Sequence, residues 1–156
     1  MTRFILYSVH SAYIAGVLAL DIVTKMLVEH ILVQPYYLFS WLSFELSYNP
    51  GVVWGITTSI ASIRYIAAGL QSVLVLYIAV YGYYRIKRDT WALGHASVVA
   101  GGIGNMLDRF YDGHVVDFIV IGKYPFVWPA FNIADIAIVC GVFCIIWQVI
   151  SKEMYV

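Results

Sequence analysis

The sequence predicts a helical membrane protein with four membrane-spanning helices and a small β-sheet on the outer surface of the membrane. Of the 156 residues, 62% are hydrophobic and only 12% are charged, whereas a soluble domain carries roughly 25% charged residues. Four apolar segments are long enough for helical spans. Between the first two, polar and apolar residues alternate as in a half-buried strand. We therefore expect one integral membrane domain over residues 1–156.

The predicted spans cover residues 4–23, 60–84, 91–107 and 133–150. We expect the first to be retained rather than removed as a signal peptide, because no convincing cleavage site follows it. Asp21 and Lys25 come at its end, four apart on one helix face. Two interpretations stay open for them: an ion pair of little energetic value, or a polar group at the mouth of a site. The third span carries rows of small or short side chains that let helices approach closely in lipid, and packing alone would explain them: Ala96, Ala100 and Gly104 in one row, Ser97, Gly101 and Asn105 in another.

The segment between the first two spans is predicted to form a surface strand. Residues alternate from Trp41 to Tyr48, and Asn49-Pro50-Gly51 follows as a turn. After the third span, a second strand is predicted from His114 to Ile121, with a turn at Gly122-Lys123 and a return over residues 124–128. The alternation predicts that Leu42, Phe44 and Leu46 are shielded, while Ser43, Glu45 and Ser47 face water.

The distribution of Lys and Arg predicts the orientation of the chain in the membrane. Four spans place both termini on one side of the membrane, and that side also receives Arg85, Lys87 and Arg88 between spans two and three. Basic residues in short loops favour the cytoplasm, so the polar motifs are expected outside. A net charge of zero argues against a nucleic-acid partner. Cys140 and Cys144, four apart on one apolar helix, favour packing over a disulfide.

Two aspartates stand out within residues 101–135, which hold four of the nine acidic residues. Asp117 and Asp135 lie among apolar residues with no basic neighbour in sequence, whereas Asp108 precedes Arg109 and is interpreted as part of a charge-balanced structural cap. Asn132 and Asp135 are three apart and share a helix face. Two close carboxylates share a proton, so one can take a proton from water while the other protonates a carbonyl oxygen. The alternative is that both are helix caps or ion-pair partners.

Other chemistries have weaker signals. The HExxH pattern is absent and the four histidines are scattered, which argues against a zinc site. The GxSxG pattern of a serine nucleophile is also absent. We expect no metal and no cofactor.

Five separated motifs resemble those of the bacterial lipoprotein signal peptidases, the signal peptidase II family. The order of the motifs, the four spans and the length agree, so the resemblance covers essentially the whole chain. The family usually has a small residue and Phe before the second glycine of its Asn-Gly motif, where this chain has Val53-Trp54, a departure that bears on the shape of the substrate cleft. The five motifs are Asp21-Ile22-Val23-Thr24-Lys25, Asn49-Pro50-Gly51 with Gly55, Gly104-Asn105-Met106-Leu107-Asp108-Arg109, Val115-Val116-Asp117-Phe118 and Phe131-Asn132-Ile133-Ala134-Asp135.

The resemblance implies an aspartyl endopeptidase of the bacterial inner membrane, with cytoplasmic termini and a site near the periplasmic face. It would act as a monomer in contact with membrane lipid and cleave diacylglyceryl-modified prolipoproteins just before the lipid-bearing cysteine. The antibiotic globomycin inhibits this family. The resemblance implies that Asp117 and Asp135 are catalytic. Substrate-site positions would be Asp21, Lys25, Asn49, Gly101, Asn105, Arg109 and Asn132, and structural positions Gly51, Gly55, Gly104 and Asp108.

Two alternatives belong to other classes. A small proton-coupled transporter or channel would use the same aspartates as a relay, although no inverted repeat is evident. A non-catalytic assembly subunit is the other. Only a peptidase would cut a lipidated precursor.

Overall fold

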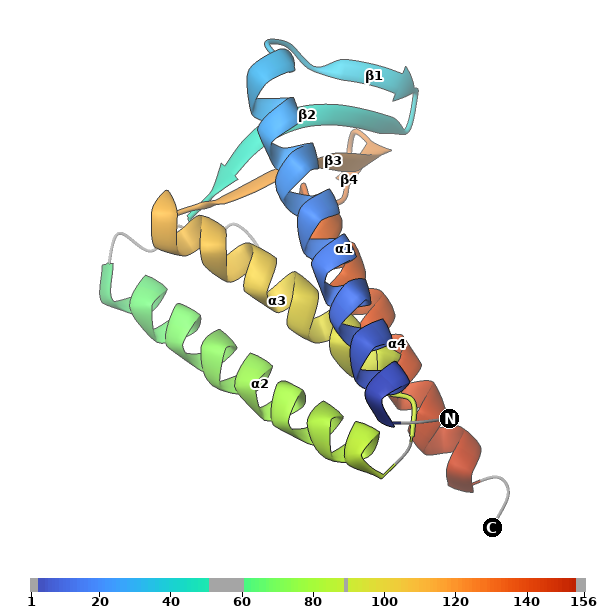
Figure 1. The fold of residues 1–156 in the computed structure, drawn as a ribbon. Coiled ribbons are helices and arrows are strands. Elements are labelled where there is room, and N and C mark those ends of the chain that lie inside the picture. The colour runs from blue at the N-terminus through green and yellow to red at the C-terminus, as the bar shows by residue number, and fades with distance from the viewer. Residues whose placement is uncertain (1–2, 51–60, 89, 154–156) are drawn as a thin grey trace.

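The computed structural model describes residues 3–50, 61–88 and 90–153 (Figure 1). Four helices and four strands follow one another along these residues. The predicted positions at Gly51, Gly55 and Val53-Trp54 lie outside the described residues. The helices are α1 (Arg3–Ile31), α2 (Ala61–Lys87), α3 (Leu93–Tyr111) and α4 (Ile133–Glu153), and the strands are β1 (Tyr36–Phe39), β2 (Leu42–Asn49), β3 (Val115–Lys123) and β4 (Phe126–Val127).

The helices lie where hydrophobicity predicts them, with one clear extension. Helix α1 continues to Ile31 instead of ending near residue 23, because Lys25 and Glu29 interrupt the apolar run without interrupting the backbone; both residue types are good helix formers. Among the residues that the structure describes, two helices are long and apolar enough to cross a membrane: Arg3–Ile31 and Ile133–Ser151. A helical fold with a small antiparallel sheet is thus confirmed.

Helix α3 is the centre of the bundle and packs against α1, α2 and α4. Its small residues permit this. A side chain at Gly101 would collide with the backbone carbonyl of Ala134, and one at Gly94 would lie 2.9 Å from the carbonyl oxygen of Gly141. The backbones of α3 and α4 therefore touch along their length, as the rows of small residues predict.

The sheet is antiparallel in the order β1-β2-β3-β4. Strands β2 and β3 confirm the two predicted strands, and Ser47 lies opposite Asp117 in their register. Strand β1 was not predicted, because its four residues are all exposed and show no alternation. The predicted turn at Gly122-Lys123 is wrong, since both residues pair with β4 and the chain reverses after them.

Ser43 is a second correction. It is buried instead of facing water, because it lies in a hollow that Tyr37 and Tyr124 also line. Its hydroxyl donates a hydrogen bond of 2.7 Å to Glu45. Ser47 is exposed, as the alternation predicts.

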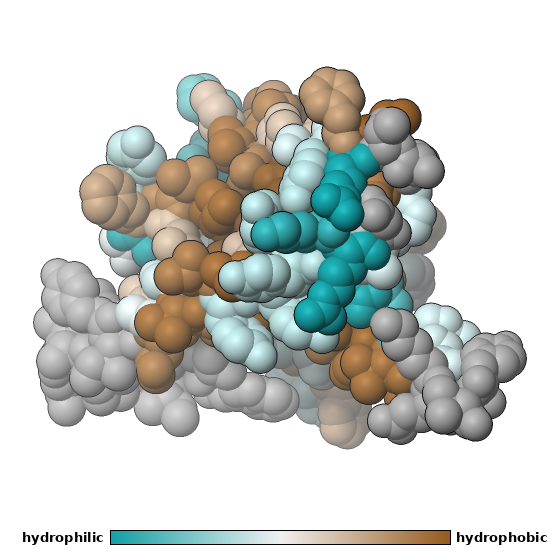
Figure 2. Space-filling view, turned by 60° about the horizontal axis from the view of Figure 1, so that its bottom comes forward, coloured by the Kyte–Doolittle hydropathy of each residue, from teal (hydrophilic) through white to brown (hydrophobic). Residues whose placement is uncertain are grey.

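The two ends of the molecule differ in character. The sheet lies at one end, while both termini and the connection between α2 and α3 lie at the other (Figure 1). Figure 2 looks toward the end with the termini, where hydrophilic side chains form a band flanked by hydrophobic ones. Arg85 and Lys87 lie in the last turn of α2 at this end.

Candidate active site

Asn132 joins the two aspartates that the sequence singles out. Its side chain is fully buried, and its Nδ2 donates to Oδ1 of Asp117 over 2.8 Å. The same nitrogen lies 3.1 Å from Oδ1 of Asn105 and 3.3 Å from the carbonyl oxygen of Val116. The two N–H groups of this amide therefore have three acceptors within reach, and these contacts fix the orientation of the side chain.

Asn132 also starts helix α4, in a reciprocal cap with Asp135. Its Oδ1 accepts the backbone N–H of Asp135 at 2.9 Å. In return, Oδ2 of Asp135 accepts the backbone N–H of Asn132 at 3.2 Å. This is a capping box with aspartate in the place of the usual glutamate. Asp135 is thus held at the positive end of the helix dipole, which stabilises negative charge.

The segment before α4 is tied to the strand that carries Asp117. The backbone N–H groups of Phe118 and Ile119 both donate to the carbonyl oxygen of Phe131, at 3.0 and 2.8 Å, and Phe131 donates back to Ile119 at 3.0 Å. These bonds set the register between β3 and the start of α4. Asn132, the next residue, therefore falls beside Asp117.

Asp117 is almost completely buried, with 3% of its surface exposed. Its Oδ2 accepts a hydrogen bond of 2.9 Å from Nδ2 of Asn49 at the end of β2. Burial raises the pKa of Asp117 to about 6; the hydrogen bond from Asn49 opposes this rise, while the charge of Asp135 adds to it. Asp117 therefore changes its protonation state near neutral pH.

Asn105 of α3 completes the site from the opposite side. Its Nδ2 donates to Oδ1 of Asp135 at 2.8 Å, so both oxygens of Asp135 are hydrogen-bonded. Its Oδ1 accepts hydrogen bonds from Asn132 and, at 3.3 Å, from Nζ of Lys25. Asn105 is therefore the link between the aspartates and a buried ionic network.

That network consists of Asp21, Lys25 and Asp108. Nζ of Lys25 lies 2.7 Å from Oδ2 of Asp21 and 2.7 Å from Oδ2 of Asp108. Asp21 and Lys25 are buried, with 1% and 3% of their surfaces exposed, and Oδ1 of Asp21 accepts the backbone N–H of Ala134 at 2.9 Å. One lysine and two aspartates thus tie α1 to α3 and to the first turn of α4.

The network corrects the interpretation of Asp108 and Arg109 as one charge-balanced cap. Asp108 pairs with Lys25 instead, and Arg109 donates to Oε1 of Gln71 on α2 at 2.9 Å. Adjacent helical residues point in different directions, so they rarely pair with each other. Gln71 carried no signal in the sequence, since its role depends on how α2 packs against α3.

The remaining predicted positions fall around this centre. Gly104 lies against Asp21, because an added Cβ would come 2.7 Å from its Oδ2. Gly101 lies at the crossing of α3 and α4 described above. Among the residues that the structure describes, no group of three His, Cys, Asp or Glu side chains is placed to hold a metal ion.

Comparison with known proteins identifies the family of the chain. The family model described as Signal peptidase (SPase) II matches residues 13–151. A lipoprotein signal peptidase of Teredinibacter turnerae is 36% identical over 141 residues, covering 85% of this chain and 81% of that protein. One of Aquifex aeolicus is 33% identical over 128 residues, covering 81% and 77%. A solved bacterial membrane enzyme superposes with a TM-score of 0.72 at 25% identity, covering 94% of this chain and 90% of that one.

The apolar helices, the small sheet and the hydrogen-bonded aspartates at their junction define a helical membrane protein with a buried acidic centre. Within that class, the chain belongs to the signal peptidase II family. Membership of this family implies that the chain is a peptidase, and it gives no support to the alternative of a transporter.

Proposed function

We propose that the chain is an aspartyl endopeptidase that removes the signal peptide from diacylglyceryl-modified prolipoproteins, cutting just before the lipid-bearing cysteine. One observation carries the proposal: Asn132 donates to Asp117 and shares a capping box with Asp135. The names of its relatives support the class of substrate.

The environments of the two aspartates suit different roles. Asp117 is buried and feels the charge of Asp135, and its raised pKa makes it the member that holds the shared proton. Asp135 accepts hydrogen bonds from Nδ2 of Asn105 and from the backbone N–H of Asn132, and it lies at a helix N-terminus, the positive end of the helix dipole. We therefore assign Asp135 as the general base and Asp117 as the general acid.

The reaction then needs no covalent intermediate. Asp135 takes a proton from a water molecule whose oxygen attacks the scissile carbonyl carbon, while Asp117 gives its proton to the carbonyl oxygen. The tetrahedral intermediate collapses when the C–N bond breaks. The leaving nitrogen receives the proton from Asp135, and Asp117 recovers its own from the hydroxyl group. The pair ends in its starting state.

The other site residues divide by position. Asp21, Lys25 and Asn105 are buried behind Asp117 and Asp135. We infer that they hold this pair, the catalytic dyad, in place. Asn49 and Arg109 are partly exposed and are the better candidates for direct contact with substrate. The role of Gly101 follows from its close approach to Ala134.

We infer that all four helices cross the bacterial inner membrane, with cytoplasmic termini and the dyad near the periplasmic face. The outward side chains of the helices support this, because they form an apolar surface far larger than a soluble monomer leaves exposed. The basic end of α2 lies with the termini, and the sheet lies at the opposite end (Figure 1). We expect a monomer surrounded by lipid. Exposed members of the apolar surface include Leu20, Leu27, Leu70, Val73, Leu76, Val139, Phe143 and Trp147.

A cleavage assay tests the function. Purified full-length protein is incubated with a lipidated precursor peptide, and the products are weighed by mass spectrometry. Cleavage directly before the modified cysteine is expected, and it should disappear in Asp117→Asn and Asp135→Asn. Asp112→Asn removes an exposed carboxylate at the end of α3 and serves as the matched control. No cut by the wild-type protein would favour a non-catalytic subunit.

A further inference from the structure

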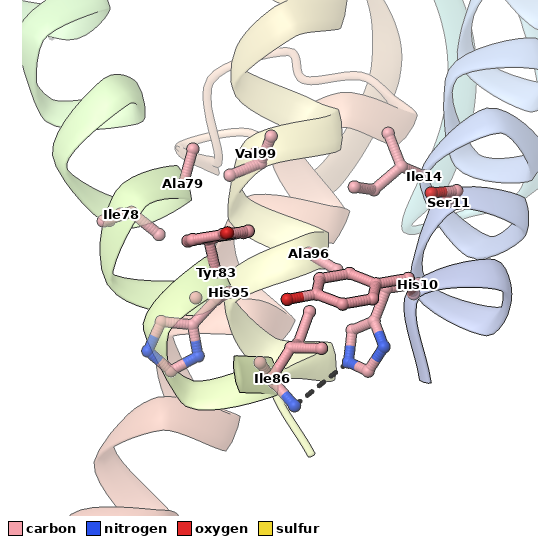
Figure 3. Close-up of a pocket in the computed structure, with 13 residues that line it drawn as sticks. His10, Ser11, Ile14, Ile78, Ala79, Tyr83, Ile86, His95, Ala96 and Val99 are labelled. Carbon is pink, nitrogen blue, oxygen red and sulfur yellow. Dashed lines mark hydrogen bonds between the residues drawn. The ribbon is translucent and has the colours of Figure 1, made fainter. Parts of the chain in front are cut away.

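A cavity lies between α1, α2 and α3, at the end of the molecule opposite the sheet (Figure 3). Its volume is about 160 Å³. Helices α1 and α2 pack closely against α3 but hardly against each other. The cavity lies in the space between α1 and α2. Its lining is mostly apolar, and its two histidines lie toward the end where α1 begins (Figure 3). The lining includes Ile14, Ile78, Val99, Tyr83, His10 and His95.

The two histidines of the cavity differ in their hydrogen bonding. Nδ1 of His10 lies 2.6 Å from the carbonyl oxygen of Leu6, and its Nε2 accepts the backbone N–H of Ala92 at 3.0 Å. His10 therefore satisfies both nitrogens and fastens α1 to the start of α3. His95 is equally buried, with 4% of its surface exposed, but its Nδ1 has no hydrogen-bond partner among the described residues.

A second buried nitrogen without a hydrogen-bond partner lies at the same end. Nε of Arg85 is buried and also lacks a partner within the described part of the chain. Its Nη2 lies 3.5 Å from the carbonyl oxygen of Trp91, whose ring centroid is 5.7 Å from that of His10. Through Trp91 and His10, Arg85 lies beside the end of the cavity rather than in its wall. Leaving a buried donor unpaired costs free energy, so Nε of Arg85, together with Nδ1 of His95 in the tautomer that carries its hydrogen there, favours an oxygen-rich ligand.

We propose that this cavity binds an anionic phospholipid of the inner leaflet, with its phosphate at Arg85, a glycerol ester oxygen at His95 and the start of one acyl chain in the cavity. Basic pockets between helices on the cytoplasmic side suit anionic head groups. Arginine N–H groups form strong, charge-assisted hydrogen bonds to phosphate. A dry apolar cavity of about 150 Å³ accommodates a molecule the size of benzene, so this one accommodates the first methylene groups of a chain.

Charge selects the phospholipid over a neutral occupant. Lys87 and Arg88 follow Arg85 at the end of α2, and both are exposed. The inner leaflet carries negative lipids whose attraction to basic side chains is worth about 1 kcal/mol for each Lys or Arg. The inference rests on the membrane placement proposed above and is independent of peptide cleavage.

Native mass spectrometry of the full-length protein tests the head group. Phosphatidylglycerol and phosphatidylcholine with identical acyl chains are offered in equal amounts, and phosphatidylglycerol should bind preferentially. Arg85→Gln should lower its affinity about fivefold, the factor that corresponds to about 1 kcal/mol for one cation. Lys123→Gln removes one exposed cation at the sheet end and should leave the affinity unchanged. Arg85→Lys, which keeps the charge, should restore part of the binding if Arg85→Gln proves unstable.

Two further variants test the cavity itself. Ala79→Trp fills the cavity and should abolish the bound phosphatidylglycerol, whereas Val80→Trp on the exposed side of α2 should not. His95→Phe keeps the aromatic ring, which stacks on Tyr81 at 5.4 Å, but removes the donor and should weaken binding. Glycerol phosphate without acyl chains should fail to compete. Equal binding of the two lipids, or equal effects of Arg85→Gln and Lys123→Gln, would overturn the proposal. Peptide cleavage is measured separately, so a failure of either proposal is recognised by itself.

Discussion

Nζ of Lys25 lies 2.7 Å from Oδ2 of Asp108, which joins the first helix to the end of the third. The same nitrogen pairs with Asp21. The lysine therefore neutralises two carboxylates. Asp108 belongs to α3, and Asp21 accepts the backbone N–H of Ala134 in α4, so the network fastens both helices behind Asp117 and Asp135. Breaking a buried ionic network by removing one partner typically costs 3–5 kcal/mol.

Exchanging the charges of Asp21 and Lys25 should therefore inactivate the protein. In the double variant Asp21→Lys, Lys25→Asp, an aspartate faces Asp108 and a lysine faces the N–H of Ala134. We expect a lower unfolding temperature in detergent and little cleavage of a lipidated precursor. A fully active, equally stable exchange variant would mean that these residues pair only with each other.

Removing either member of the dyad should abolish turnover. Asp117→Asn and Asp135→Asn keep the shape of the side chain but cannot transfer the proton, and positioned acid–base groups contribute about 10² to 10⁴ in rate. The double variant should be scarcely slower than either single one, because the groups act as a unit. The measurement is the rate of precursor cleavage at equal amounts of membrane-inserted protein. Substantial turnover in either single variant would contradict the assignment.

The pKa of Asp117 predicts the pH dependence of cleavage. With a pKa of about 6 and an active form that carries the proton, kcat/KM should fall roughly tenfold for each pH unit above 6. Asn49→Ala removes a hydrogen bond that lowers this pKa, so the decline should begin at a higher pH. A profile that rises through pH 6 would assign Asp117 as the base instead.

Asn132 can be tested separately as a positioning residue. Asn132→Ser keeps an oxygen that can cap α4 but loses the amide that holds Asp117, while Asn132→Ala loses both. Cleavage should fall strongly in both variants. Both variants leave the buried acceptors of the amide unpaired, and the alanine variant should lose about 1 kcal/mol of stability more than the serine variant, the usual value of a helix cap. Wild-type kcat in the serine variant would show that the amide is not needed.

Reporter fusions test the orientation. A fusion at Val156 should report the cytoplasm and one beside Asp112 the periplasm, because the basic end of α2 lies at the same end as the termini (Figure 1). Finding both reporters on one side would exclude four crossings.

Local sequence patterns predict much of this fold. The apolar runs predict the four helices, and the alternation around Ser47 and Asp117 predicts the two central strands. Strand β1 has no such pattern, since all its residues are exposed. The burial of Ser43 depends on Tyr37 of β1 and on Tyr124 in the turn between β3 and β4, which lie outside the alternating segment, so it has no local signal.

The candidate site divides in the same way. Asn132 followed three residues later by Asp135 is a readable capping pattern, although only their shared helix face was inferred from it. The partners of Lys25 and Arg109 come from distant helices, so nearness in sequence predicted the wrong partner for Asp108. The lack of a basic neighbour did separate Asp117 and Asp135 from Asp108 and Asp21.

Asp135 both caps helix α4 and is the proposed general base, and this limits how the site can be transferred to another protein. Its carboxylate closes the first turn of α4 and is also the proposed base, so it cannot be moved along the helix without leaving a frayed end. To transfer this site to another protein scaffold, the four consecutive residues Asn132 to Asp135 must be transferred together. The recipient helix must begin at the graft, with a strand carrying the second carboxylate alongside.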